Sequence, residues 1–198
     1  MEYKSVKRIK VGLDVDGTLA HSQEAIVNEY NIRTNGSHTK EELDSHTGWS
    51  MPITHEEFSE LHYTIWKDKW ERIKPAVSEN ALSRLADVCD VQLLTGIPKE
   101  CDDGLRGWLG SNFPNTAMEI RYVISLREKP YLGYDVIFDD ADPVADELIK
   151  APGIGTRLYL IDQPWNKRRR YEEESSRITR VKSLSHGIES LLSELQRI

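Results

Sequence analysis

Short apolar runs recur along the chain and predict five β-strands. The runs are rich in Val, Ile, Leu and Tyr, as strands are. They span Ile9–Val15, Val88–Thr95, Ile120–Ile124, Val136–Asp139 and Arg157–Ile161. The last three are nearly continuous apolar runs, which is typical of strands covered on both faces. The pattern therefore favours a sheet that is buried between two layers.

Segments of helical character lie between the later runs. In one of them Asp142 is expected to be the N-cap of a helix with Pro143 at its first position, and Gly153 follows as a stop. Residues 177–181 can add an edge strand, and Ser185–Gln196 is predicted to be a closing amphipathic helix. The alternation predicts an α/β fold, a Rossmann-like doubly wound parallel sheet whose ligands bind beyond the carboxyl ends of the strands.

The stretch from Leu19 to about Pro75 interrupts this alternation. It has no good strand, and Thr54-x-x-Glu57 resembles a capping box that opens a helix of about four turns. We interpret the stretch as a small helical cap inserted after the first strand. The predicted division is an α/β core of residues 1–18 and 76–198 and a helical cap of residues 19–75.

Length, charge and cysteine content narrow the class of protein. The 198 residues suffice for one α/β core with a modest insertion. The formal net charge of −7 attracts neither nucleic acid nor an anionic membrane, so a nucleic-acid polymer is not an expected partner. No apolar run is long enough to span a bilayer, and the first ten residues lack a signal core. Cys89 and Cys101 lack disulfide or zinc-site spacing, which predicts a reduced, cytoplasmic compartment.

Two aspartates follow the first predicted strand. Asp14 and Asp16 are two positions apart, so on an extended chain both carboxylates point to one spot beyond the strand end. Gly17 relieves the turn, and Thr18 can offer its hydroxyl to the loop or to a ligand. Adjacent carboxylates repel unless a cation or a shared proton neutralises them. The alternative is an acidic turn that caps the following helix.

A second acidic group follows the strand Val136–Asp139. Asp139 and Asp140 end an apolar strand, and two charges at such a place need a partner. A hard cation suits them, and Mg²⁺ typically takes one or two carboxylates together with waters and phosphate oxygens. The pair therefore predicts a Mg²⁺ site.

Two further segments supply a hydroxyl and a cation. Thr95 ends the second strand-like run, and Gly96 leaves the backbone amide accessible. Lys129 lies just ahead of the strand that ends in the acidic pair. Each feature alone is more often a strand-end turn or a solvated charge. Together with the aspartates they provide a nucleophile, a metal site, a hydroxyl donor and a cation, which is the set that phosphoryl transfer needs.

These residues, in this order, resemble the haloacid dehalogenase superfamily of phosphatases. Its signature is DxDGT, a strand-end Ser or Thr, a lysine and a strand-end acidic pair. Within it the chain is most similar to the 5′(3′)-deoxyribonucleotidases, through DVDGTLA, the spacing from Lys129 to Asp139 and the QPWN run at 163–166. QPWN has meaning only through the resemblance. The lysine departs from the usual Asp-Lys-Thr setting, because the sequence here is Glu128-Lys129-Pro130.

The resemblance implies a role for each residue. Asp14 is the expected nucleophile and forms an aspartyl-phosphate, while Asp16 is the expected general acid and base. Thr95 and Lys129 are expected to bind the non-bridging phosphate oxygens. The implied Mg²⁺ ligands are the Asp14 side chain, the Asp16 carbonyl and Asp139, with Asp140 in support.

The substrate is expected to be a small phosphoester, with a nucleoside monophosphate as the first choice. Besides Thr18 and Gly96, the expected substrate-binding residues are the cap aromatics Trp49, Phe58 and Trp66, since base–aromatic stacking is worth about 1–3 kcal/mol. For any single ring, packing of the cap is the commoner role. A phosphatase for another small phosphoester and a non-catalytic binding protein on the same fold are the alternatives, and a homodimer remains open.

Overall fold

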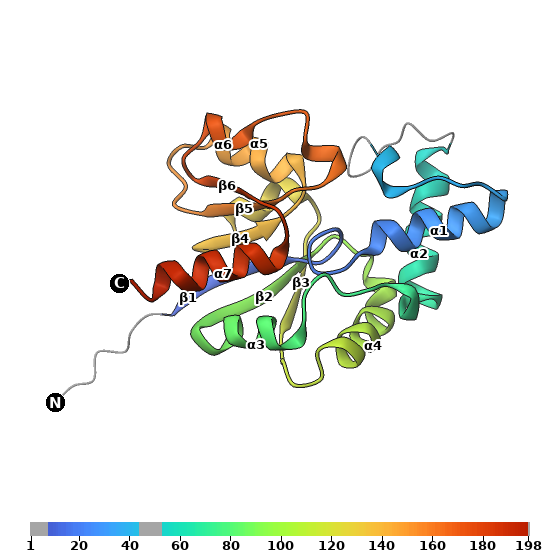
Figure 1. The fold of residues 1–198 in the computed structure, drawn as a ribbon, viewed down its shortest axis with the longest axis horizontal. Coiled ribbons are helices and arrows are strands. Elements are labelled where there is room, and N and C mark those ends of the chain that lie inside the picture. The colour runs from blue at the N-terminus through green and yellow to red at the C-terminus, as the bar shows by residue number, and fades with distance from the viewer. Residues whose placement is uncertain (1–7, 44–52, 198) are drawn as a thin grey trace.

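The computed structural model describes residues 8–43 and 53–197, and its centre is a six-stranded sheet (Figure 1). All neighbouring strands are parallel, in the order β3-β2-β1-β4-β5-β6. This order reverses between β1 and β4, where doubly wound sheets bind their ligands. The strands are β1 (Ile9–Asp14), β2 (Cys89–Thr95), β3 (Glu119–Tyr122), β4 (Val136–Asp139), β5 (Arg157–Ile161) and β6 (Ile178–Val181). The predicted fold class is confirmed.

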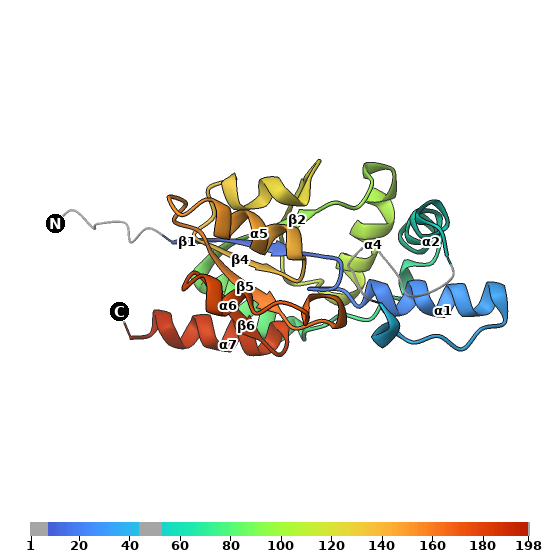
Figure 2. The ribbon, with the colours of Figure 1, turned by 90° about the horizontal axis from the view of Figure 1, so that it is seen from above.

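Helices cover both faces of the sheet. Leu93 and Phe138 point to one face and pack in a core with Ile188 of α7 (Leu184–Leu195) and residues of α3 (Glu79–Val88). Their chain neighbours Leu94 and Ile137 point to the opposite face, into a core with residues of α5 (Asp142–Lys150) and α6 (Tyr171–Glu174). Figure 2 shows α7 lying along one side of the sheet. Burial on both faces explains why these strands are almost continuously apolar.

Several strand boundaries differ from the prediction by one or two residues. β1 ends at Asp14, β3 begins at Glu119 and β6 begins at Ile178. β2 begins one residue late, because Val88 is the last residue of α3. β3 ends at Tyr122, and Ile124 is completely exposed.

The predicted cap of α5 is wrong. Asp142 is the first residue of the helix, and the N-cap is Ala141, which makes no side-chain cap hydrogen bond. The reason is that the Ala141 N–H already bonds to the Asp139 carboxylate at 2.9 Å, which places the helix start one residue earlier. The helix also ends at Lys150, ahead of the predicted stop.

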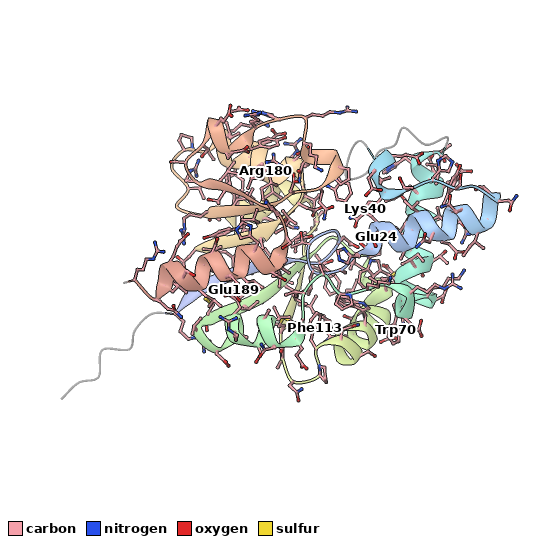
Figure 3. The ribbon with its side chains drawn as sticks, in the orientation of Figure 1. Glu24, Lys40, Trp70, Phe113, Arg180 and Glu189 are labelled. Atoms are coloured by element: carbon pink, nitrogen blue, oxygen red, sulfur yellow. The ribbon has the colours of Figure 1, made fainter. Side chains whose placement is uncertain are left out.

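A helical segment follows β1 beyond the carboxyl edge of the sheet (Figure 1). It contains α1 (Ser22–Thr34), η1 (Lys40–Glu42), α2 (His55–Asp68) and η2 (Trp70–Arg72). The predicted capping box opens α2: the Glu57 N–H donates to the Thr54 hydroxyl at 3.2 Å, and the Thr54 N–H donates to the Glu57 carboxylate at 2.8 Å. Figure 3 shows Glu24 of α1 beside Lys40, with which it pairs at 3.1 Å.

The helical segment packs on α4 (Asp102–Asn112) without a break in the apolar core. Trp66 of α2 lies edge-on to Trp108 of α4, with ring centroids 5.7 Å apart. A Cβ at Gly104 would lie 1.8 Å from the Trp66 carbonyl oxygen, so only glycine allows this approach. Trp70 and Phe113 flank α4 in Figure 3. The division into a core and a cap of residues 19–75 stays a prediction.

Among the residues that the structure describes, no helix is both long and apolar enough to cross a membrane.

Candidate active site

Three carboxylates meet where the sheet order reverses. β1 and β4 are hydrogen-bonded neighbours, with Leu13 opposite Phe138, so the residues after these positions share one edge. Oxygen atoms of Asp14, Asp139 and Asp140 all lie within 4.8 Å of one another, and the three side chains are buried. The parallel register thus brings together groups that are more than a hundred residues apart in sequence.

Lys129 forms ion pairs with two of these carboxylates. It lies in η4 (Leu126–Tyr131), which packs against α5. Its Nζ donates to Asp14 at 2.6 Å and to Asp139 at 2.7 Å, and its side chain is completely buried. Burial disfavours the charged ammonium, but the charges of Asp139 and Asp14 outweigh this cost and raise the pKa of Lys129. The lysine is therefore a fixed positive charge beneath the carboxylates.

One ammonium does not neutralise three carboxylates. Burial raises the pKa of Asp14 to about 8, with Asp139 adding to the rise and Lys129 opposing it. Burial, followed by the charges of Asp14 and Asp139, also raises the pKa of Asp140. Each shift reports the cost of excess negative charge in a dry site. An all-oxygen donor set with this excess charge fits a divalent hard cation such as Mg²⁺.

Asp140 is held by groups from two loops. The Thr18 hydroxyl donates to one carboxylate oxygen at 3.1 Å, and the Trp165 indole N–H donates to the other at 3.0 Å. The Asn166 side-chain amide donates to the Asp140 carbonyl at 2.9 Å. Gly17 has a φ of 78°, and a Cβ there would lie 2.3 Å from the Asp140 carboxylate. Both loops are shaped around this one carboxylate.

The QPWN run thereby gains a physical meaning. Besides the two donors to Asp140, its first residue, Gln163, donates to the Gly17 carbonyl at 2.6 Å. Arg180, labelled in Figure 3, supports the run from β6 by donating to the Asn166 side chain at 2.7 Å. The run clamps the loop after β1 to the loop after β4. Its chemistry was not readable from sequence, because it depends on which loops the fold brings together.

Asp16 faces a different direction from the three clustered carboxylates. Its two oxygens contact α2, one receiving the Trp66 indole N–H at 2.8 Å and the other lying 3.2 Å from His62 Nε2. Burial opposes ionisation of Asp16, but the His62 charge and hydrogen bonds from His62, Ser22 and Trp66 outweigh it and lower its pKa. His62 was missed at the sequence level. Its only signal is the spacing of four residues to both Phe58 and Trp66.

A cavity of about 350 Å³ opens above Asp14 and Asp16. One wall comes from α2, through His55, Phe58, Ser59 and His62, and the other from the chain after β3, through Val123, Ile124 and Leu126. Gln23, Gly96, Pro98, Asp139, Asp140 and Ala141 complete the lining. The nucleophile candidate thus lies at the floor of a largely apolar cavity.

The other residues that the sequence predicts for the site differ in whether they line the cavity. Thr95 is buried at the end of β2, and its hydroxyl accepts the Ile97 N–H at 3.0 Å. Gly96 and Phe58, which are assigned to substrate binding from the sequence, line the cavity. Trp66 is fully buried, does not line the cavity and uses its N–H on Asp16. Trp49 lies outside the described residues. The roles assigned to these side chains stay predictions.

Solved structures share the fold. A conserved haloacid dehalogenase-like protein from Agrobacterium tumefaciens has a TM-score of 0.58 at 14% identity, covering 96% of this chain and 100% of its own. A hydrolase from Pseudomonas syringae has a TM-score of 0.55 at 15% identity, covering 96% and 99%. A haloacid dehalogenase family hydrolase from Deinococcus radiodurans, solved with phosphate and sodium, has a TM-score of 0.55 at 14% identity, covering 93% and 95%. No curated protein matches the sequence.

A family model identifies the chain more narrowly. Residues 7–184 match the model described as 5′ nucleotidase, deoxy (pyrimidine), cytosolic type C protein. The match covers both strand ends that carry the aspartates, the helical segment and the QPWN run. The chain therefore belongs to this 5′ nucleotidase family, is a phosphoric monoester hydrolase, and shares its fold with haloacid dehalogenase-like proteins.

Proposed function

We propose that the protein is a Mg²⁺-dependent phosphatase of nucleoside monophosphates that works through an aspartyl-phosphate. The observation that carries the proposal is the buried Lys129 bridge between Asp14 and Asp139 at the floor of the cavity. A carboxylate fixed by a permanent cation, and open to a cavity on its other side, is placed to attack a bound phosphate. Family membership supports the same chemistry.

In this mechanism Asp14 attacks phosphorus in line, and the bond from phosphorus to the ester oxygen breaks. Asp16 enters this step protonated, gives that proton to the departing alkoxide and is left as a carboxylate. Asp16 then takes a proton from water, which attacks the aspartyl-phosphate, breaks its bond to Asp14 and releases inorganic phosphate. The Lys129 ammonium offsets the charge on Asp14 throughout. Thr95 is the hydroxyl donor toward the phosphate oxygens.

The residues present fit a bound Mg²⁺. Asp14, Asp139 and the Asp16 carbonyl would hold the ion with Asp140 in support, and the ion would neutralise charge on the phosphoryl group. Thr18 and Trp165 orient Asp140 for this purpose by donating to its two oxygens.

The cavity supports a leaving group that is apolar and uncharged. Phe58, Val123, Ile124 and Leu126 present apolar surface beside the floor, and Ile124 is completely exposed. No Lys or Arg is among the described residues that line the cavity, so none of them would neutralise a second phosphate. A nucleoside monophosphate, with one phosphate and a flat aromatic base whose faces can stack on apolar side chains, suits this lining better than a diphosphate or a bisphosphate.

The two free, buried cysteines agree with a cytoplasmic protein.

A panel of phosphate esters tests the proposal. Phosphate release is measured from 5′- and 3′-monophosphates of ribo- and deoxyribonucleosides, a nucleoside diphosphate and several sugar phosphates, each with Mg²⁺ and with EDTA. We expect Mg²⁺-dependent release from nucleoside monophosphates and at least about tenfold lower kcat/KM for the diphosphate, a difference of about 1.4 kcal/mol. Release from sugar phosphates alone would refute the substrate and keep the chemistry. No release from any ester by folded protein would refute the function.

A further inference from the structure

Helix α2 supplies two hydrogen-bonding groups to one carboxylate. Trp66 Nε1 donates to Asp16 at 2.8 Å, and His62 Nε2 lies 3.2 Å from the other oxygen of the same side chain. When Asp16 is a carboxylate, as it is before it takes the proton of the attacking water, it only accepts hydrogen bonds, and His62 Nε2 is then the donor in this contact. The two donors come from successive turns of α2, on the face toward the sheet. The Asp16 carboxylate is thus held at both oxygens.

The two donors are themselves rigid. Trp66 is completely buried against Trp108, and its backbone carbonyl lies against Gly104 of α4. The His62 ring stacks on Phe58, with ring centroids 6.3 Å apart and an interplanar angle of 23°. A carboxylate held by fixed groups loses the rotamer freedom that a strand-end aspartate otherwise has. Proton transfer is sensitive to such placement, since a shift of 1 Å can cost about 100-fold in rate.

We propose that His62 and Trp66 are positioning residues that hold Asp16 for proton transfer to and from the reacting oxygen. The inference rests on the proposed function, in which Asp16 is the acid and base. It goes further by making α2 a fixed part of the acid–base machinery, in addition to a wall of the cavity. Neither side chain needs to touch the phosphate for this role.

Two esters separate this role from a structural one. Deoxyuridine 5′-monophosphate releases a poor alkoxide leaving group, which needs a proton donor, whereas 4-nitrophenyl phosphate releases a stable anion that does not. The kcat/KM of each ester reports the steps up to aspartyl-phosphate formation, where the leaving group departs. Loss of positioning should therefore lower kcat/KM for the nucleotide alone.

For His62→Ala and Trp66→Phe we expect kcat/KM for the nucleotide to fall by about 10- to 100-fold. We expect kcat/KM for 4-nitrophenyl phosphate to stay within about threefold, because that leaving group needs no general acid. Its kcat should fall with an initial burst of nitrophenol, because the water attack also uses Asp16. His62→Gln, whose amide can donate from a similar place, should recover part of the loss.

Two variants serve as matched controls. His55→Ala removes another histidine of α2 that lines the same cavity, and it should change kcat/KM for both esters by the same factor. Trp108→Phe keeps an aromatic ring beside Trp66 but removes the indole donor to the Ile73 carbonyl, at 2.8 Å, so it should lower stability without separating the esters. Equal losses for both esters in His62→Ala and Trp66→Phe would overturn the inference while the phosphatase function stands. A wild-type protein that hydrolyses neither ester would overturn both.

Discussion

At the scale of the residue, the charge of the Asp14 carboxylate is subject to two opposite effects. Lys129 stabilises its charge, while burial and the neighbouring aspartates disfavour it. Asp14→Asn keeps the shape of the side chain and removes the nucleophilic oxygen. We expect phosphate release to fall by at least about 1000-fold, as for other single nucleophile losses, with little change in the melting temperature. Steady-state assays and thermal unfolding check this, and a near-normal rate would reject Asp14 as the nucleophile.

Lys129 is the second residue whose loss has a defined cost. Lys129→Met leaves three buried carboxylates without their cation, and breaking a buried ion pair in this way costs about 3–5 kcal/mol. Urea unfolding at neutral pH measures the change. Lys150→Met is the control, because within the described part of the chain its exposed ammonium pairs with Glu147 alone, at 3.2 Å, and such pairs contribute little. Equal stabilities of the two variants would mean that Lys129 does not carry the cluster.

The sequence predicts those site residues that lie at strand ends. Asp14, Asp139 and Asp140 follow apolar runs, and parallel strands place their carboxyl ends at one edge, so their meeting follows from topology. His62 and Trp165 could not be found in this way. Their contacts depend on the rotation of α2 and on which two loops the fold apposes, and neither is encoded in a local pattern.

At the scale of the element, an ion-pair network joins α1 to the segment after α2. The Glu29 carboxylate is buried and receives Lys69 at 2.6 Å, Arg72 at 2.9 Å and Arg33 at 3.2 Å. Burial opposes its ionisation, but the contacts with Lys69 and Arg33 outweigh this and lower its pKa below the ordinary 4.5. We expect Glu29→Gln to lose about 1–3 kcal/mol of stability at pH 7.

The pH dependence of this loss has a definite sign. A depressed pKa in the folded protein means that Glu29 contributes stability above its ordinary pKa of 4.5, and that the contribution is lost as the pH falls through the folded value. Wild type and Glu29→Gln should therefore converge in urea unfolding as the pH falls below 4.5 and through the depressed folded pKa of Glu29. Glu60→Gln is the control, because this exposed acid pairs with Arg33 alone among the described residues. A gap that persists at low pH would contradict the network.

The contact of α2 with α4 depends on one glycine. Alanine is a better helix former than glycine by about 1 kcal/mol, so Gly110→Ala, which meets nothing within 4 Å, should stabilise the protein by about that amount. Gly104→Ala instead drives a methyl group against the Trp66 carbonyl, and overpacking of this kind costs about 1–3 kcal/mol. Thermal unfolding compares the two. A stabilised Gly104→Ala would show that α2 and α4 are not in close contact.

Elements were predictable where one physical cue dominates. The continuous apolar runs in the sequence predict β4 and β5 with the bounds that the structure shows. The Thr54–Glu57 capping box predicts where α2 begins. The cap of α5 was predicted wrongly because the Ala141 N–H bonds to the side chain of Asp139, two residues earlier, and the simple pattern of an N-cap followed by proline does not include this competing contact.

At the scale of the whole molecule, the sheet and the helical segment build the site jointly. The carboxyl ends of β1 and β4 supply three carboxylates, η4 supplies the lysine, and α2 supplies the donors to Asp16. The sequence predicts the inserted segment from its broken alternation. It does not predict that Trp66 and Trp108 make one continuous apolar core across the expected boundary, because tertiary packing decides that.

A divalent cation should stabilise the whole fold. Without metal, burial and repulsion among the three clustered carboxylates disfavour their charges and raise the pKa of Asp14 and Asp140, and the protein as a whole carries a net charge of −7. An ion that binds only the folded state adds about 2.7 kcal/mol at a concentration 100 times its Kd. We therefore expect Mg²⁺ to raise the melting temperature of the wild type, and EDTA to reverse the rise.

Asp139→Asn separates this effect from general screening of charge. The amide keeps the size of the side chain but removes one ligand charge from the cluster, so the shift in melting temperature with Mg²⁺ should shrink or vanish. Asp142→Asn is the matched control: it removes a carboxylate three residues further along that lies outside the cluster, and it should keep the full shift. If both variants respond to Mg²⁺ as the wild type does, the ion acts on the overall charge, and the three carboxylates are not its site.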